Sequence, residues 1–391
     1  MTSPTVPDIS RLKPVYFAVF LDMVAFAVIL PVLPFYAMDL GATGLWLGIL
    51  LTSYSAAKLL GAAVAGRLSD LFGRRLLLVI CLFGSGVSFL LTGLAQSLVM
   101  LALSRAIAGL FAGTVAIAQA YVADVTPPRD RARFLGFLGA SIGMGFIVGP
   151  AIGASLSHLG FVFATILAAA LAFLNAFAAL VTVRESPSSR SALGERAHWQ
   201  QVIAQPGLLV VLAAMFLTMF AFVAMETTLA FVARDSYELD ERGFGMILVY
   251  VGLIMITVQG GLVGRLVDRL GERRVSAFGA LLLGTGLFML PYAPNTASGF
   301  VLLGVLAVGQ GLVGPSLSAL LSRRTASTLQ GGVLGLGQSA ASAARAGAPV
   351  VAGWLYDQST EWPFLLAGGA ALLAGIAVAR IRYPEAAEAE A

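Results

Sequence analysis

Apolar stretches of about 20 residues follow one another along the whole 391-residue chain, and only short polar links separate them. A helical stretch of that length matches the thickness of the hydrocarbon core of a bilayer. Hydrophobic residues make up 59% of the chain and charged residues 11%, whereas an ordinary soluble domain has about 25% charged residues. The pattern therefore predicts an all-α integral membrane protein and excludes a water-soluble globule.

About a dozen such helices would use the whole chain and leave no room for a separate soluble domain. The polar segment 184–206 predicts a cytoplasmic linker between an N-terminal six-helix bundle at 1–183 and a C-terminal bundle at 207–391, which ends in a short acidic tail. We expect the helices at 14–36, 44–65, 76–95, 98–123, 134–157, 161–183, 207–231, 243–263, 275–293, 298–321, 330–354 and 362–380.

The basic residues indicate how the helices are oriented. With the N-terminus inside, 19 of the 24 lysines and arginines fall in inside segments and only 2 in outside loops. The positive-inside rule then places both termini in the cytoplasm. No small-residue cleavage site follows a short apolar core, so we expect the first helix to be retained. The pI of 9.4 does not indicate nucleic-acid binding, because the basic residues lie in loops on one side of a membrane. A bacterial inner membrane fits this arrangement.

One charged link, residues 66–75, recurs at 264–274, an offset of 198 residues or about half the chain. Gly66 and Gly73 permit a tight reversal. Asp70 and Arg74 can pair across the turn, and Asp124, at the end of the fourth helix on the same side, can join them. Alternatively, these residues only cap helices within a positively charged loop. The repeat instead favours two related halves that share one functional element. The residues assigned to the second copy are Gly264, Asp268 and Arg274.

Five charged residues fall inside expected helices, and a charge there is costly unless it has a partner. Asp22 is the obvious partner of Arg105, and Glu226 and Arg345 form a second acid and arginine in the other half. A carboxyl group that alternates between burial and a nearby cation can take up and release protons. Lys58 either extends its ammonium to the interface or binds anionic substrate groups. Alternatively, Asp22 anchors the start of its helix near the cytoplasmic interface, and Glu226 lies at a hydrated position near the outer end of its helix.

The fifth helix carries a run of small residues that allow a neighbouring backbone to approach closely. Pro150 removes an internal hydrogen bond and bends this helix. Ordinary small-residue packing is the alternative to a functional role. The residues concerned are Gly145, Gly149, Pro150 and Gly153.

Other polar or aromatic residues within helices are candidates for the wall of a cavity. Each polar one can instead hold helices together, at about 0.6 kcal/mol per hydrogen bond. These candidates are Phe26, Tyr54, Gln119, Phe222, Gln259, Gln310 and Gln338. The two histidines lie in links and the single cysteine in an apolar run. We therefore expect neither a metal site nor an enzyme, and the chain has no GxxxxGK[ST] loop for ATP.

These motifs resemble those of the major facilitator superfamily, in particular its twelve-helix drug:proton antiporters. The charged link resembles the loop of the superfamily that latches one conformation. Asp22, with Pro31 after it, resembles the opening of the drug:proton antiporters, and Arg105 resembles their proton-coupling arginine. The glycine run resembles the antiporter motif, although Ala154 takes the place of its last glycine. Tetracycline exporters carry further membrane acids, whereas here Ser88 holds the matching place in the third helix.

The resemblance implies two pseudo-symmetric six-helix bundles, built from inverted repeats, that rock about a cavity between them. It implies a secondary transporter, a proton-coupled antiporter that exports amphipathic or hydrophobic small molecules in multidrug or tetracycline-like efflux. Export of a metabolite, sugar or lipid on the same scaffold is the alternative, and a non-cycling sensor or a membrane enzyme is less favoured. We expect no cofactor beyond the coupling proton, and a functional monomer whose partners are the substrate and the bilayer. The sequence does not distinguish proton from sodium coupling.

Overall fold

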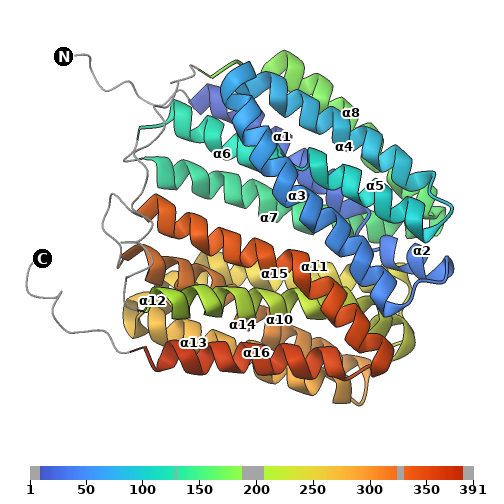
Figure 1. Cartoon of the computed structure of the whole chain (residues 1–391), viewed down its shortest axis with the longest axis vertical. Helices are drawn as coiled ribbons and strands as arrows, with labels where there is room; N and C mark the ends of the chain where they lie inside the picture. Colours follow the sequence, from blue (N-terminus) through green and yellow to red (C-terminus); the bar gives the residue numbers. More distant parts are fainter. Residues whose placement is uncertain (1–8, 128–129, 187–206, 324–329, 382–391) are drawn as a thin grey trace, which may run out of the picture. The chain divides into compact units, whose positions relative to one another are not determined.

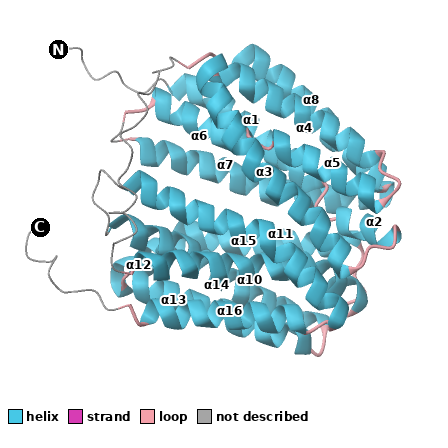
Figure 2. Ribbon diagram, in the orientation of Figure 1, coloured by secondary structure: helices cyan, strands magenta, loops and turns pink. Residues whose placement is uncertain are grey.

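The computed structural model describes residues 9–127, 130–186, 207–323 and 330–381 (Figure 1). Within these ranges every regular element is a helix (Figure 2). Eleven helical segments there are long and apolar enough to cross a membrane. Helix α15 (Gln330–Gln358) adds a twelfth of 29 residues, in which Ser339 and Arg345 lower the hydropathy. The predicted all-α membrane architecture is confirmed.

The helices follow the apolar stretches and begin or end at the polar links. The first eight are α1 (Ile9–Val28), α2 (Leu33–Asp39), α3 (Gly44–Phe72), α4 (Arg74–Gly93), α5 (Leu98–Phe111), α6 (Thr114–Val125), α7 (Arg131–Leu156) and α8 (Phe161–Thr182). The later ones, besides α15, are α10 (Leu208–Asp235), α11 (Glu241–Thr257), α12 (Val263–Leu270), α13 (Glu272–Met289), α14 (Thr296–Arg323) and α16 (Trp362–Ala379). Short turns of 3₁₀ or π helix lie at Ser157–Leu159, Val258–Leu262 and Leu290–Tyr292.

Two stretches predicted as single helices are interrupted in the structure. The stretch 14–36 divides into α1 and α2 because Pro31 has no N–H to continue the helix, and α2 begins with Pro34 in its first turn. The stretch 98–123 divides into α5 and α6 at Ala112 and Gly113. Hydropathy could not indicate either break, since the residues on both sides of each are apolar.

The chain forms two compact units, Met1–Ala192 with Ala233–Gly252 and Leu193–Val232 with Leu253–Ala391. The first half of α11 belongs to the first unit, where the ring of Phe244 lies 5.9 Å from that of Phe35. The domain boundaries expected from the sequence stay a prediction, and most of the expected linker, residues 187–206, lies outside the described ranges.

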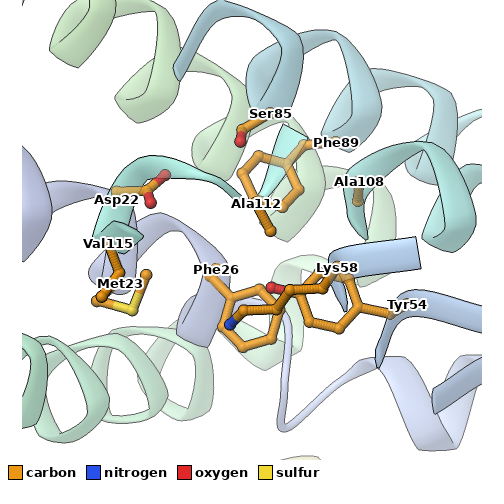
Figure 3. Close-up of a pocket in the computed structure, with 10 residues that line it drawn as sticks. All are labelled: Asp22, Met23, Phe26, Tyr54, Lys58, Ser85, Phe89, Ala108, Ala112 and Val115. Atoms are coloured by element: carbon orange, nitrogen blue, oxygen red, sulfur yellow. The ribbon is translucent and has the colours of Figure 1, made fainter. Parts of the chain in front are cut away.

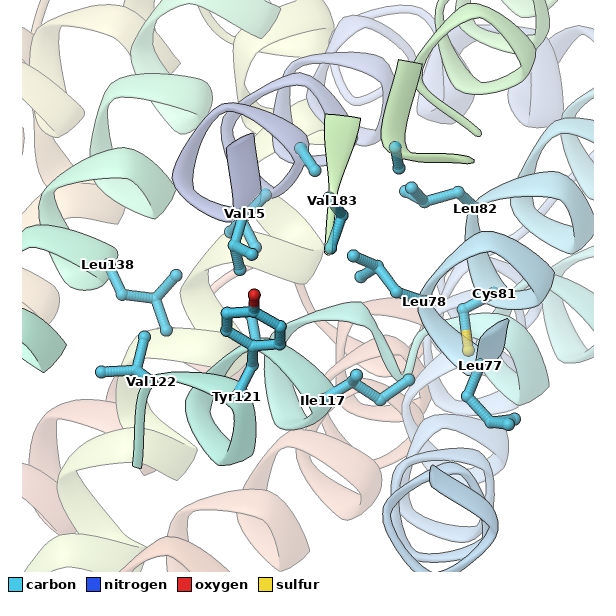
Figure 4. Packing of buried hydrophobic residues seen from close by; sticks show 14 of the residues in the cluster. Val15, Leu77, Leu78, Cys81, Leu82, Ile117, Tyr121, Val122, Leu138 and Val183 are labelled. Carbon is cyan, nitrogen blue, oxygen red and sulfur yellow. The ribbon is translucent and has the colours of Figure 1, made fainter. Parts of the chain in front are cut away.

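A core cluster in the first unit holds α1, α4, α6 and α7 together around Tyr121 (Figure 4). The Tyr121 side chain is 1% exposed and packs among Val15, Leu78 and Leu138. Its hydroxyl donates a hydrogen bond of 2.9 Å to the carbonyl of Arg184, just beyond α8. The ring thus sits in the core while its polar tip ties down the chain that leaves α8, as a buried tyrosine requires.

Candidate functional site

A pocket that is partly open to solvent lies within the first unit. Four residues singled out in the sequence, Asp22, Phe26, Tyr54 and Lys58, line it together (Figure 3). They come from α1 and α3, which are far apart in sequence. The remaining lining residues, from α1, α4, α5 and α6 and the break between the last two, are Met23, Ser85, Phe89, Ala108, Ala112 and Val115.

Asp22 lies in the middle of α1 and is 6% exposed. Its carboxylate interacts electrostatically with the Thr114 hydroxyl, at the start of α6, and with the Lys58 ammonium from α3. The Thr114 hydroxyl is buried and has no hydrogen bond of ordinary geometry. Thr114 is the first residue of α6 and directly follows the break at Ala112 and Gly113.

Lys58 is half-buried and lies over an aromatic face of the pocket. Its ammonium nitrogen is 5.7 Å from the centre of the Tyr54 ring, within the range of a cation–π interaction. The Tyr54 ring stacks on Phe26, with centroids 5.0 Å apart, and Phe26 in turn meets Phe146 of α7 edge to face at 6.1 Å. Helices α1, α3 and α7 thereby contribute one continuous aromatic wall.

Arg105 of α5 is 2% exposed, but the structure does not pair it with Asp22 as we expected. Its guanidinium donates a hydrogen bond of 2.8 Å to the Thr92 hydroxyl and lies 6.0 Å from the Phe89 ring. Thr92 in turn donates to the carbonyl of Ser88 at 2.8 Å. No acid lies within ion-pair distance of Arg105 in the described part of the chain. One neutral hydroxyl on α4 therefore accepts from this guanidinium, whose buried Nε has no hydrogen bond in the described part of the chain. The sequence-based prediction missed this contact because it searched for a carboxylate.

The first copy of the charged link forms the expected contacts. Arg74 makes an ion pair of 2.5 Å with Asp70 and one of 3.0 Å with Asp124. Its guanidinium also donates to the buried Ser69 hydroxyl at 2.6 Å. Gly73, between α3 and α4, has φ of +100°, which a residue with a side chain rarely adopts. One arginine thus joins α3 to the end of α6.

The residues just after α8 complete this cluster, although no sequence motif predicted that they would. The Glu185 carboxylate accepts hydrogen bonds from the backbone N–H groups of Arg74, at 2.6 Å, and Arg75, at 3.2 Å. It therefore caps the N-terminus of α4, where unpaired N–H groups favour an acid. Ser186 donates to the same Asp124 oxygen that accepts from Arg74, at 3.0 Å. The start of the expected linker is thus bonded to the charged link.

The second copy shares the backbone turn but not the charge arrangement. Gly271 has φ of +80° and matches Gly73. The position that matches Arg74 is Glu272, however, and both Asp268 and Arg274 are exposed. Arg274 thus lies two positions beyond the match of Arg74, and its role as the second latch cation stays a prediction. Arg273 donates to the carbonyl of Ile381 at 2.8 Å, just as Arg75 donates to that of Leu180.

The small residues of α7 face α1. A Cβ added at Gly145 would lie 2.4 Å from the Met23 Cβ, and one at Gly149 2.5 Å from the Ala27 Cβ. At Gly153 it would lie 2.2 Å from the carbonyl oxygen of Val28. Pro150 lies inside α7, which continues to Leu156. The run therefore lets α7 approach the helix that carries Asp22.

The Ala154 methyl fills the space left by a glycine on a neighbouring helix. A Cβ added at Gly245 of α11 would lie 2.5 Å from the Ala154 Cβ and 3.2 Å from Pro31. Alanine in place of the motif's last glycine is thus matched by a glycine across the contact.

Glu226 and Arg345 lie in the second unit, where the Arg345 charge acts on the Glu226 carboxylate. Glu226 in α10 is half-buried, as is Phe222, whereas Arg345 in α15 is exposed. Gln310 is buried in α14, and its side-chain oxygen accepts no hydrogen bond. The other cavity candidates, Gln119, Gln259 and Gln338, are exposed and do not line the pocket of the first unit.

The sequence profile of the Major Facilitator Superfamily matches residues 15–343 and 260–391. The chain belongs to the major facilitator superfamily. It is 27% identical over 363 residues to multidrug resistance protein 2 of Bacillus subtilis, covering 90% of each chain. It is 31% identical over 328 residues to the class G tetracycline resistance protein of Vibrio anguillarum, covering 81% of this chain and 82% of that protein.

Solved structures show the same fold. A bacterial homologue of the lysosomal transporter Spinster superposes with a TM-score of 0.79 at 14% identity, covering 98% of this chain and 100% of the other. A D-xylose–proton symporter superposes with a TM-score of 0.73 at 18% identity, covering 97% and 98%. The protein is therefore a multi-pass membrane transporter of the major facilitator fold, similar to drug and tetracycline resistance proteins as the motifs indicated.

The neutral surroundings of Arg105 fit the difference from tetracycline exporters noted in the sequence. By the resemblance described above, Ser88 takes the place of a membrane acid of tetracycline exporters. It is fully buried, and its hydroxyl donates to the carbonyl of Gly84 at 2.7 Å. Its own carbonyl accepts from Thr92, which accepts from Arg105. In this protein the arginine is thus held by a hydroxyl one helical turn from the position of the missing acid.

Proposed function

We propose that this protein is a proton-coupled antiporter that exports amphipathic or hydrophobic small molecules by alternating access. The single observation that carries the proposal is the buried Asp22 in the wall of a partly aromatic pocket. Ligand pockets combine apolar walls with a few polar groups, and Asp22 is a titratable group among such walls. The printed names of the relatives, multidrug and tetracycline resistance proteins, support export.

In this proposal a proton and the substrate use the same carboxyl group at different times. With Asp22 ionised, the pocket binds substrate; when Asp22 takes a proton from outside, substrate leaves. Proton entry down its gradient then drives export. No cofactor beyond the proton takes part, and one chain suffices because pocket, acid and charged link all lie in one unit.

The cluster around Arg74 would hold one conformation and release during the cycle. Its charges are bonded to each other and to the residues after α8. In this proposal these contacts break as α3 and α6 separate within the first unit. The excess of basic residues in the inside links supports a cytoplasmic membrane location with both termini inside.

The test is proton release when substrate is added to purified protein in weakly buffered detergent. Wild type should release protons with at least one of a lipophilic cation, a neutral drug and a zwitterionic drug. Asp22→Asn should bind more weakly and release no protons, whereas Asp39→Asn, which changes an exposed aspartate at the end of α2, should behave as wild type.

Loss of release in Glu226→Gln instead of Asp22→Asn would move the coupling role to the second unit. Binding without proton release from wild type with every compound would refute proton antiport and favour sodium coupling or a sensor.

A further inference from the structure

The pocket holds two unlike charges that form no direct ion pair. Asp22 and Lys58 both line it, from α1 and α3 (Figure 3). Among the described residues no ion pair of 4.0 Å or less joins them. The Lys58 ammonium instead lies over the Tyr54 ring at 5.7 Å, so it keeps donors that a ligand can use.

A second cation stands directly behind the pocket wall. The Arg105 guanidinium lies 6.0 Å from the ring of Phe89, which lines the pocket. The pocket and its wall therefore hold two cations and one acid. A ligand whose only charge is positive gains from Asp22 but is repelled by Lys58 and Arg105, and a neutral ligand leaves Lys58 without an anionic partner.

The shape of the pocket wall also restricts which ligands fit. Tyr54 and Phe26 are stacked at 5.0 Å and 25°, and Phe89 forms another face. Flat aromatic faces favour a flat, conjugated ligand. The acidic group of such a ligand would reach Lys58 while its amine reaches Asp22, so that each charge gains a partner.

We propose that Lys58 is an anion subsite and that the preferred substrates are aromatic zwitterions, with the acidic group at Lys58 and the cationic group at Asp22. This inference rests on the proposed function, since it names the substrate class of the same pocket. It also agrees with proton exchange, because the ligand's cationic group and a proton compete for one carboxylate.

Three xanthene dyes of nearly equal size test the proposal by equilibrium binding to purified protein. Rhodamine 110 carries a carboxylate and a cationic ring system, rhodamine 123 is its methyl ester and lacks the anion, and fluorescein has the carboxylate without the amines. Wild type should bind rhodamine 110 about tenfold or more tightly than rhodamine 123, because a hydrogen bond to a charged group contributes about 1.5–3 kcal/mol.

Variants of Lys58 and Asp22 test which residue binds each charged group of the dye. Lys58→Met should weaken rhodamine 110 about tenfold and leave rhodamine 123 unchanged or tighter, whereas Lys58→Arg should keep the preference for rhodamine 110. Asp22→Asn should weaken both rhodamines and spare fluorescein. Thermal unfolding of each variant identifies any that lost affinity through misfolding. If Lys58→Met is misfolded, the comparison of Lys58→Arg with wild type still tests whether a cation at this position sets the preference for rhodamine 110.

The anion subsite is refuted if Lys58→Met weakens rhodamines 110 and 123 equally, if wild type prefers the ester, or if wild type binds none of the dyes. Failure of the proposed function has a different signature. In that case the Lys58-dependent preference is present in binding, but vesicles with an imposed pH gradient move no dye.

Discussion

The contact between α7 and α1 allows a sharp test of the packing beside Asp22. In Gly145→Ala the new Cβ would start 2.4 Å from the Met23 Cβ and 3.1 Å from the carbonyl oxygen of Phe20. Met23 follows Asp22 and itself lines the pocket. The atom in the way is a Cβ, fixed to its backbone, so no side-chain rotation relieves the contact. Helices α1 and α7 must separate by about 0.6 Å to reach even the 3.0 Å limit of real contacts.

The expected cost follows from two opposing effects. Overpacking of this kind costs about 1–3 kcal/mol, whereas alanine is favoured over glycine in a helix by about 1 kcal/mol. The net change is a destabilisation of up to about 2 kcal/mol. Gly136→Ala is the matched control, because it lies on the same helix and an added Cβ there meets nothing within 4 Å. It should be neutral or stabilising.

The assay is thermal unfolding of both variants in one detergent, together with dye binding. We expect a lower melting temperature and weaker binding for Gly145→Ala, and wild-type or higher values for Gly136→Ala. Equal melting temperatures for the two variants would show that α1 and α7 yield without cost and would refute the argument from close packing.

Two further predictions concern the polar contacts that only the structure reveals. Glu185→Ala removes the cap of α4 and should cost about 1 kcal/mol, measured as faster hydrogen exchange of the Arg74 amide. Glu185→Gln keeps an acceptor, so the Arg74 amide should exchange more slowly than in the alanine variant. An equal exchange rate in both variants would contradict the cap. Thr92→Val removes the hydroxyl that binds Arg105 and should cost about 1.5–3 kcal/mol of stability, by thermal unfolding. Thr285→Val is the control, because its hydroxyl donates only to carbonyls of its own helix, those of Leu281 and Leu282. An equal loss in both variants would contradict the assignment.

Much of the fold follows from local pattern. The length of each apolar stretch sets the length of a membrane helix, since backbone groups in lipid must be bonded within the segment. The expected helix at 161–183 is observed at Phe161–Thr182. The close contact of Asp70 and Arg74 was also predictable, because the two residues lie on either side of the tight turn at Gly73.

The sequence by itself determined the apolar stretches that become membrane helices, the turn at Gly73 and the residues of the charged link, since these depend on hydropathy, spacing and backbone freedom. Only the tertiary structure decided the partners of the buried charges. Arg105 meets Thr92 rather than Asp22, and Glu185 caps a helix that begins 111 residues earlier. Such contacts depend on which faces of distant helices meet. A hydroxyl, a carboxylate or an aromatic ring at the right depth can each stabilise a buried charge. The sequence contains many of these groups, and it does not show which of them lie close together in space.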